Sequence, residues 1–145
     1  MRIVLQRVKS AYVSVNDKIV GHINKGVVLL VGVTHNDNED SAKWLADKCV
    51  NLRIFPDDNN KMNLSLKDVN GEILVISQFT VYGDCQHGRR PGFSDAAEPV
   101  FAQNLYEKFV KFLKQSRLKV ETGVFQEMML VQINNDGPVT FILEK

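Results

Sequence analysis

Two short segments contain most of the residues that are suited to chemistry. The first, residues 77–80, has the sequence Ser-Gln-Phe-Thr and directly follows the apolar run 73–76. Hydroxyl and amide groups at the end of a buried strand either line a binding site or hydrogen-bond the neighbouring backbone. Ser77 and Thr80 carry hydroxyl groups that serve as nucleophiles in some hydrolases, but the sequence identifies no base partner for either one. These residues alone leave both interpretations open.

The second segment is Asn-Asp-Gly-Pro-Val-Thr at residues 135–140, which lies between the apolar runs 128–133 and 139–143. By local rules it is a polar turn that joins two strands. Pro138 has no N–H group for a sheet, so it is expected only at a strand start, an edge or a bulge. A Gly-Pro step also leaves carbonyl oxygens free to face a ligand. The pattern therefore predicts a hairpin corner, with a ligand-binding loop as the alternative.

Other catalytic and metal-binding patterns are missing from the sequence. His22, His35 and His87 are far apart, and none has a cysteine or carboxylate at metal-ligand spacing. The acidic run 57–60 lacks the glycine and the final glutamate of a calcium loop, and we interpret it as a solvated loop. Nucleophile-elbow and phosphate-loop patterns are also missing. The sequence therefore predicts neither a metal nor a cofactor.

The spacing of apolar residues predicts an α+β fold. Alternating or continuous apolar segments predict strands at 2–8, 11–15, 18–23, 27–31, 72–81, 118–125, 128–134 and 139–143. Helical spacing predicts one helix over about residues 39–52 and another that begins near residue 95. The apolar face of the second helix consists of Phe101, Leu105, Phe109, Phe112 and Leu113. Its opposite face is either solvated or contacts phosphates, and carries Lys108, Lys111 and Lys114.

The composition is that of a single globular domain over residues 1–145, with 44% hydrophobic and 24% charged residues. A net charge of +1 gives no overall basic field, so any nucleic-acid contact requires a local patch. No apolar run approaches the roughly 20 residues of a membrane span, and no signal-peptide pattern is present. Cys49 and Cys85 form no disulfide framework, and Cys49 is expected to be structural. We therefore expect a cytoplasmic protein without membrane contact.

Several segments of the chain, taken in order, resemble the signatures of the D-aminoacyl-tRNA deacylases, also called D-tyrosyl-tRNA deacylases. The family patterns Ser-Gln-Phe-Thr-Leu-Tyr-Gly and Asn-x-Gly-Pro-Val-Thr match residues 77–83 and 135–140, with Val81 in place of leucine. The resemblance extends to residues 1–8, 61–66 and 88–94. It implies an α+β chain of two packed, mainly antiparallel sheets with helices covering one face.

The resemblance implies hydrolysis of the ester bond of D-aminoacyl-tRNA and of glycyl-tRNA, with rejection of L-aminoacyl-tRNA. In the family, the site contains the residues that match Ser77, Gln78, Phe79 and Thr80. The backbone amides around Phe79 and Thr80 face the scissile carbonyl, which is the place of an oxyanion partner. The 2′-hydroxyl of the substrate's own adenosine activates the water, which accounts for the missing side-chain base.

The resemblance also implies a homodimer in which a cis Gly137-Pro138 step reaches into the partner's pocket. The carbonyl oxygens of this step hold the α-amino group and leave no room for an L side chain. Arg7 resembles the family arginine that supports the Gly-Pro step. Phe125 and Met129 match positions near the terminal adenosine of tRNA.

Two other functions are alternatives. One is a deacylase that clears L-alanine from mischarged tRNA, which uses a differently oriented Gly-Pro motif; the intact Gly-Pro-Val-Thr at 137–140 argues against it. The other is a non-catalytic nucleic-acid-binding module, suggested by the lysine face and by Arg89 and Arg90. Together with His87, these arginines either meet tRNA phosphates or stabilise a turn through arginine–carbonyl bonds.

Overall fold

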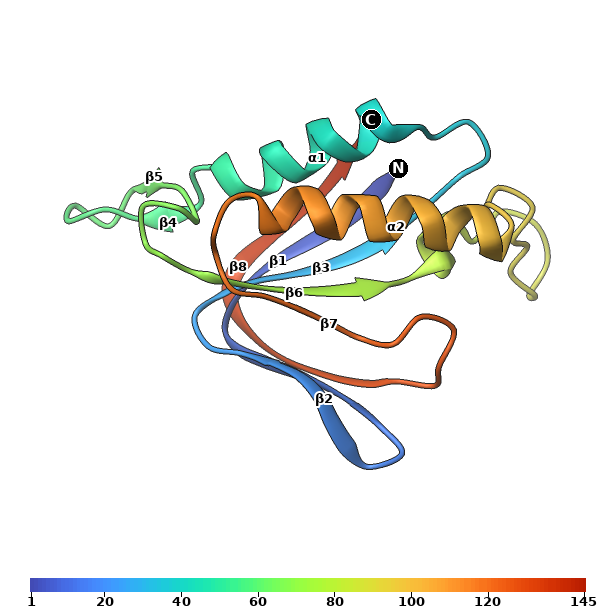
Figure 1. Cartoon of the computed structure of the whole chain (residues 1–145), viewed down its shortest axis with the longest axis horizontal. Helices are drawn as coiled ribbons and strands as arrows, with labels where there is room; N and C mark the ends of the chain where they lie inside the picture. The colour runs from blue at the N-terminus through green and yellow to red at the C-terminus, as the bar shows by residue number, and fades with distance from the viewer.

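Two α-helices lie over one face of a strongly curved, six-stranded sheet in the computed structural model, which describes residues 1–145 (Figure 1). The strands of this sheet are β1 (Arg2–Val15), β2 (Lys18–Ile23), β3 (Gly26–Gly32), β6 (Glu72–Ser77), β7 (Val120–Thr122) and β8 (Leu130–Glu144). The helices are α1 (Glu39–Asn51) and α2 (Pro99–Lys114). The remaining elements are the paired strands β4 (Phe55–Pro56) and β5 (Met62–Leu64), and the 3₁₀ helix η1 (Phe79–Tyr82).

The first and last strands hold the sheet together. β1 pairs antiparallel with β3 through residues 2–8 and with β2 through residues 11–15, and β8 also runs antiparallel along β1. β3 and β6 pair in parallel, as do β6 and β7. The predicted α+β class is confirmed. The prediction of two packed sheets is wrong in this respect: the six strands form a single, nearly closed sheet. The long strands β1 and β8 connect its two halves.

Apolar side chains form a separate core on each face of the curved sheet. The larger core packs the sheet against α1 and α2, and it contains Leu29, Ile73 and Phe109. The smaller core contains Val28 and Leu74, which come from the same two strands as Leu29 and Ile73. Because neighbouring residues of a strand point to opposite faces, β3 and β6 are buried on both faces. Their unbroken apolar runs are typical of this position.

The Asn-Asp-Gly-Pro segment is not a hairpin corner, because β8 continues through it as one strand. The prediction of two strands joined by a turn is therefore wrong. β1 is the reason, since it pairs with β8 on both sides of the segment. Between these pairs, residues 136–139 of β8 lie opposite Arg7 alone, and the extra residues form a bulge. Pro138 occupies this bulge, where its missing N–H is tolerated, and the Gly137-Pro138 peptide bond is cis.

β6 is shorter than the predicted strand 72–81 and ends at Ser77. Its partner β3 ends at Gly32, and the last bond between these two segments joins Gln78 N–H to Val31 O at 2.8 Å. Val81 N–H then donates to Gln78 O at 3.3 Å, which turns the chain into η1. The Ser-Gln-Phe-Thr segment therefore lies on a strand-to-helix turn.

Both α-helices were expected, and the first begins and ends close to its predicted positions. Asn38 caps α1 by accepting the Ser41 N–H at 3.0 Å, and Pro99 occupies the first turn of α2. Cys49 of α1 is buried, and this burial raises the pKa of its thiol to about 12, in agreement with a structural role. Phe101 is 42% exposed, so the apolar face of α2 begins further along the helix than predicted. Neither helix combines the length and the apolar character needed to cross a membrane.

Candidate functional site

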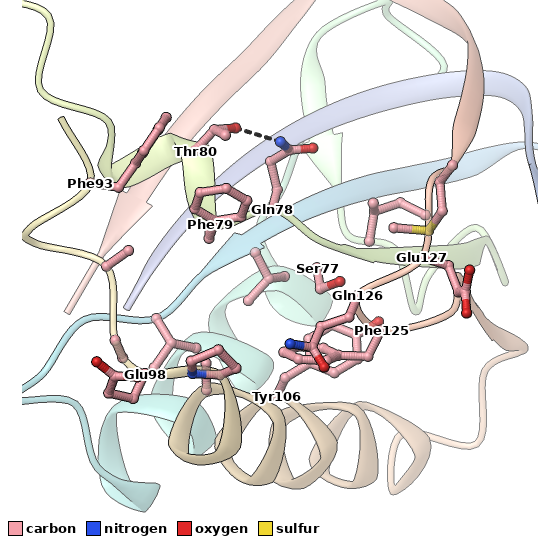
Figure 2. A pocket seen from close by; sticks show the side chains of 18 of the residues that line it. Ser77, Gln78, Phe79, Thr80, Phe93, Glu98, Tyr106, Phe125, Gln126 and Glu127 are labelled. Carbon is pink, nitrogen blue, oxygen red and sulfur yellow. Dashed lines mark hydrogen bonds between the residues drawn. The ribbon is translucent and has the colours of Figure 1, made fainter. Parts of the chain in front are cut away.

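A cavity of about 780 Å³ opens where β6 ends (Figure 2). Residues 76–80 form one side of it, and the segment from Phe93 to the first turns of α2 forms another. The loop between β7 and β8, residues 125–129, closes the third side. Most of the lining is apolar, with a few polar groups among it, which is the usual character of a pocket for a small organic group.

All four residues of the Ser-Gln-Phe-Thr segment line this cavity. The Gln78 side-chain amide donates to Thr80 Oγ1, so the two side chains hold each other across the turn (Figure 2). Phe79 and Thr80 are the first residues of η1, and the first N–H groups of a helix have no acceptor within it. Ser77 is half-buried at the back of the turn. The turn therefore presents free N–H groups beside a fixed pair of side chains.

Aromatic rings line two sides of the cavity. Phe79 meets Phe93 edge to face, with 5.0 Å between ring centroids and 67° between planes. Tyr106 of α2 and Phe125 form a tilted pair at 5.9 Å. The Tyr106 hydroxyl donates to Val75 O at 2.9 Å, and its burial raises the pKa of this phenol further above the ordinary value. Tyr106 therefore stays neutral and fixed in position.

The β7–β8 loop carries Phe125, Gln126, Glu127 and Met129 into the lining. Phe125 and Met129 are both partly buried, and a Cβ at Gly123 would lie 2.5 Å from Met129 Sδ. Glycine at this position therefore allows the methionine to lie directly against the backbone. Figure 2 shows the side chains of Phe125 and Gln126 facing the space in front of Ser77.

The cavity contains no nucleophile paired with a base. Thr80 Oγ1 contacts the Gln78 amide, and neither Ser77 nor Thr80 contacts a histidine or a carboxylate. None of the three histidines is among the lining residues; His35 Nε2 instead lies 2.7 Å from Ser94 O. Nowhere in the chain do three His, Cys, Asp or Glu residues gather as metal ligands would. What the turn itself offers is a set of free N–H groups, which can bind a reacting group and stabilise negative charge on it.

The other predicted substrate-binding residues, Arg7, Gly137 and Pro138, lie outside the cavity lining of their own chain. Arg7 is buried, and its Nε lies 3.2 Å from Asp136 O and 3.0 Å from Asp136 Oδ2. Its Nη1 donates to Ile54 O. Gly137 and Pro138, which follow Asp136 in the bulge, are exposed. The structure therefore joins Arg7 to the Gly-Pro bulge and keeps both apart from residues 77–80.

Phe93, Glu98 and Tyr106 also line the cavity, and the sequence predicted no site role for any of them, although Phe93 lies in the matched stretch 88–94. Phe93 and Glu98 lie in a loop and at a helix start, where spacing gives no signal. Tyr106 lies three residues before Phe109 on the buried face of α2, and a tyrosine on such a face needs a partner for its hydroxyl. That requirement is the one signal in the sequence that marks Tyr106.

Comparison with known proteins gives a consistent result. The profile of the family described as D-Tyr-tRNA(Tyr) deacylase matches residues 4–144. A D-aminoacyl-tRNA deacylase from Picosynechococcus sp. is 58% identical over all of this chain and 97% of its own length. Another from Clostridioides difficile is 56% identical over 99% of this chain and 97% of its own length.

Two solved structures have the same fold. The c-Myc DNA unwinding element binding protein superposes with a TM-score of 0.93 and 34% identity, covering 100% of this chain and 99% of that protein. A probable eukaryotic D-amino acid tRNA deacylase has the same fold, with a TM-score of 0.89 at 18% identity over 99% of this chain and 98% of its own. The chain belongs to the D-Tyr-tRNA(Tyr) deacylase family.

Proposed function

We propose that this protein is a D-aminoacyl-tRNA deacylase, which hydrolyses the ester bond between a D-amino acid and the terminal adenosine of tRNA. The products are the free D-amino acid and tRNA. The observation that carries the proposal is that residues 77–80, the family signature, line a largely apolar cavity together with Phe125 and Met129. Relatives that are 58% and 56% identical bear the name of this activity. The proposal treats residues 1–145 as one deacylase domain.

In the proposed reaction, the ester carbonyl oxygen faces the N–H groups of Phe79 and Thr80. Water attacks the carbonyl carbon, and these donors stabilise the negative charge that develops on the oxygen. The adenosine 2′-hydroxyl assists removal of the water proton, because Ser77 and Thr80 have no base beside them. The bond from the carbonyl carbon to the ribose oxygen then breaks, and that oxygen takes up a proton. The protein contributes mainly by positioning the reactants.

The proposed site is completed by a second copy of the chain. Gly137 and Pro138 are exposed on the bulge and absent from the cavity lining of their own chain, so a homodimer is needed to bring them to residues 77–80. In the partner's cavity, their carbonyl oxygens bind the α-ammonium group of the aminoacyl ester. Arg7 fixes this bulge through Asp136.

This arrangement predicts the stereochemical preference. With the ammonium group held at the bulge, an L side chain collides with the backbone, whereas a D side chain points out of the pocket. The enzyme therefore accepts many D-amino acids, and it accepts glycine, which has no side chain to exclude. Aminoacyl-tRNA is used in translation, so we place the enzyme in the cytoplasm.

A hydrolysis assay with D-tyrosyl-, L-tyrosyl- and glycyl-tRNA tests the proposal. With tRNA in large excess over enzyme, we expect multiple turnovers for the D-tyrosyl and glycyl esters and none above background for the L-tyrosyl ester. L-Alanyl-tRNA belongs in the same assay, because its preferential hydrolysis is the signature of the alternative deacylase. Absence of D-tyrosyl-tRNA turnover by folded protein would contradict the proposal.

A non-catalytic nucleic-acid-binding module is the second candidate function. It is favoured by Arg89 and Arg90, which are exposed and without ion pairs, and by the DNA-binding name of the relative that is 34% identical. Turnover in the assay above excludes a module that only binds.

A further inference from the structure

A seven-residue loop, residues 85–91, lies in the chain between the 77–80 turn and Phe93, both of which line the cavity, and we call it the basic loop. It carries His87, Arg89 and Arg90, all exposed, and contains no acidic residue. In Figure 1 it extends outward from the end of the molecule where η1 and the first turn of α2 lie. The positive charge of this loop is therefore local, in a chain whose net charge is only +1.

The base of the basic loop is fixed. Asp84 N–H donates to Gly92 O at 2.8 Å, and Gly92 N–H donates back to Asp84 O at 2.9 Å. The Asp84 carboxylate accepts the Gln86 N–H at 2.9 Å, so it is bonded to the loop backbone and not to a loop arginine. Only the tip of the loop, which bears the basic side chains, is free of such bonds.

Contacts on the far side hold the loop next to the cavity. Phe93 comes two residues after the loop, lines the cavity and packs edge-on against Phe79. The next residues are bonded to the end of β3, since Thr34 Oγ1 donates to Asp95 O at 2.6 Å and Ala97 N–H donates to Val33 O at 2.9 Å. The segment that follows the loop is therefore bonded to Val33 and Thr34, which lie beside the turn at 77–80.

The arginines of the basic loop differ from Arg2, Arg7 and Arg53; among the other arginines, only Arg117 is likewise exposed and without an ion pair. Arg2 and Arg7 are held by carboxylates, and Arg53 donates to Asn63 O. Arg89 and Arg90 make no ion pair, and they donate to no carbonyl oxygen, so they do not stabilise the turn that carries them. Two unpaired guanidinium groups side by side are suited to phosphate, which they bind through two parallel N–H donors.

We propose that the basic loop binds the phosphates of the unpaired 3′ end of tRNA that precede the terminal adenosine. This inference rests on the proposed function, because that function puts the aminoacyl-adenosine in the cavity beside the loop. The RNA strand must leave the cavity through its mouth, where Phe79 and Phe93 lie. Phosphate contacts position a nucleic acid without reading its sequence. Such contacts suit an enzyme that acts on tRNAs of different sequence.

The test compares wild type with the double variant Arg89→Ala/Arg90→Ala. Its first readout is the Kd for uncharged tRNA at several salt concentrations. We expect binding to weaken about tenfold or more, and the slope of log Kd against log salt to fall by about 1.4 for two lost contacts to single-stranded phosphates.

The control is Lys111→Ala/Lys114→Ala, which removes the same charge from α2; its slope should stay near that of wild type. Arg89→Lys/Arg90→Lys keeps the charge and should retain most of the slope.

The second readout is the ratio of kcat/KM for D-tyrosyl-tRNA to that for D-tyrosyl-adenosine, which carries no phosphate. This ratio should fall about tenfold or more in the alanine double variant. Equal losses on both substrates, or tRNA binding equal to wild type, would overturn the role of the loop while leaving the deacylase function intact. Failure of wild type to hydrolyse either substrate would instead refute the proposed function, and the binding data would still decide the role of the loop.

Discussion

The Nε–H group of Arg7 lies between two oxygen atoms of Asp136, 3.0 Å from Oδ2 and 3.2 Å from the backbone oxygen. The Arg7 side chain is 10% exposed, and its Nη1 also donates to Ile54 O. One buried guanidinium therefore joins the bulge of β8 to the segment that follows α1. Because Asp136 directly precedes the Gly-Pro step, Arg7 fixes the position from which Gly137 and Pro138 project.

Replacement of Arg7 by alanine should lower the free energy of unfolding by about 1–3 kcal/mol. It leaves the Ile54 carbonyl without its donor and the Asp136 carboxylate without its partner. Urea denaturation measures the loss, and deacylation should fall with it as the bulge loses its support. The control is Lys108→Ala, which removes the exposed pair with Glu39 and should leave the midpoint unchanged. Equal midpoints for both variants would mean that Arg7 does not hold the bulge.

Phe79→Pro removes a backbone N–H from the proposed oxyanion site. Proline is tolerated in the first turn of a helix, and Phe79 is the first residue of η1. We expect kcat to fall about 10²- to 10³-fold, which is the usual effect of losing one oxyanion donor. Phe79→Ala keeps the N–H and is the matched control, with a loss below about tenfold by the same reasoning. Circular dichroism checks that both variants fold, and similar losses in the two would rule out the N–H as the important group.

Thr80→Ala should retain substantial hydrolysis in a single-turnover assay. The Thr80 hydroxyl contacts the Gln78 amide and no base, so we assign it a positioning role. Loss of a covalent nucleophile typically lowers the rate by several orders of magnitude. Gln78→Ala breaks the same contact from the other side and should have a comparably small effect. A loss of several orders in folded Thr80→Ala, with binding preserved, would identify Thr80 as the nucleophile.

A tRNA that ends in 2′-deoxyadenosine, charged on its 3′-oxygen, should bind normally and react slowly. The cavity supplies no histidine to activate water, and neither hydroxyl of the 77–80 turn contacts a carboxylate, so the substrate hydroxyl is the proposed base. General-base assistance is commonly worth about 10²- to 10⁴-fold. Affinity has to be measured separately, so that a loss of binding is not mistaken for a loss of reactivity. Near-normal turnover of the deoxy substrate would show that a protein group activates the water.

The proposed dimer can be tested by mixing two inactive variants. Phe79→Pro disables the cavity, and Gly137→Val adds a side chain to the bulge at a position where a Cβ alone would lie 3.1 Å from Asn135 Nδ2. If the site is shared between subunits, a mixed dimer contains one intact site, and full exchange should restore about a quarter of wild-type activity. Mixtures that stay inactive after exchange would place both segments in the same subunit's site. Sedimentation should also give twice the chain mass of 16.4 kDa.

Several parts of this protein follow from the sequence alone. The runs 27–31 and 73–76 are unbroken and apolar, and they form β3 and β6, which are buried on both faces. The helix predicted over 39–52 is observed at Glu39–Asn51. These features depend on the partition of apolar side chains and on local caps, which the spacing of residues records directly. The signature at 77–80 likewise identified the segment that lines the cavity.

The tertiary structure determined the features that depend on contacts between segments distant in the chain. Local rules predicted a hairpin corner at residues 135–138. Instead, β1 pairs with β8 on both sides of these residues and keeps the strand continuous, with a bulge opposite Arg7. The same holds for the cavity, whose walls come from the end of β6, from the β7–β8 loop and from the segment that runs from Phe93 into α2. Phe93 and Tyr106 line the cavity only because the sheet curves and α2 packs across it. Hydrogen-bond ladders and packing between distant segments outweigh local turn preferences, and the spacing of residues along the chain does not record them.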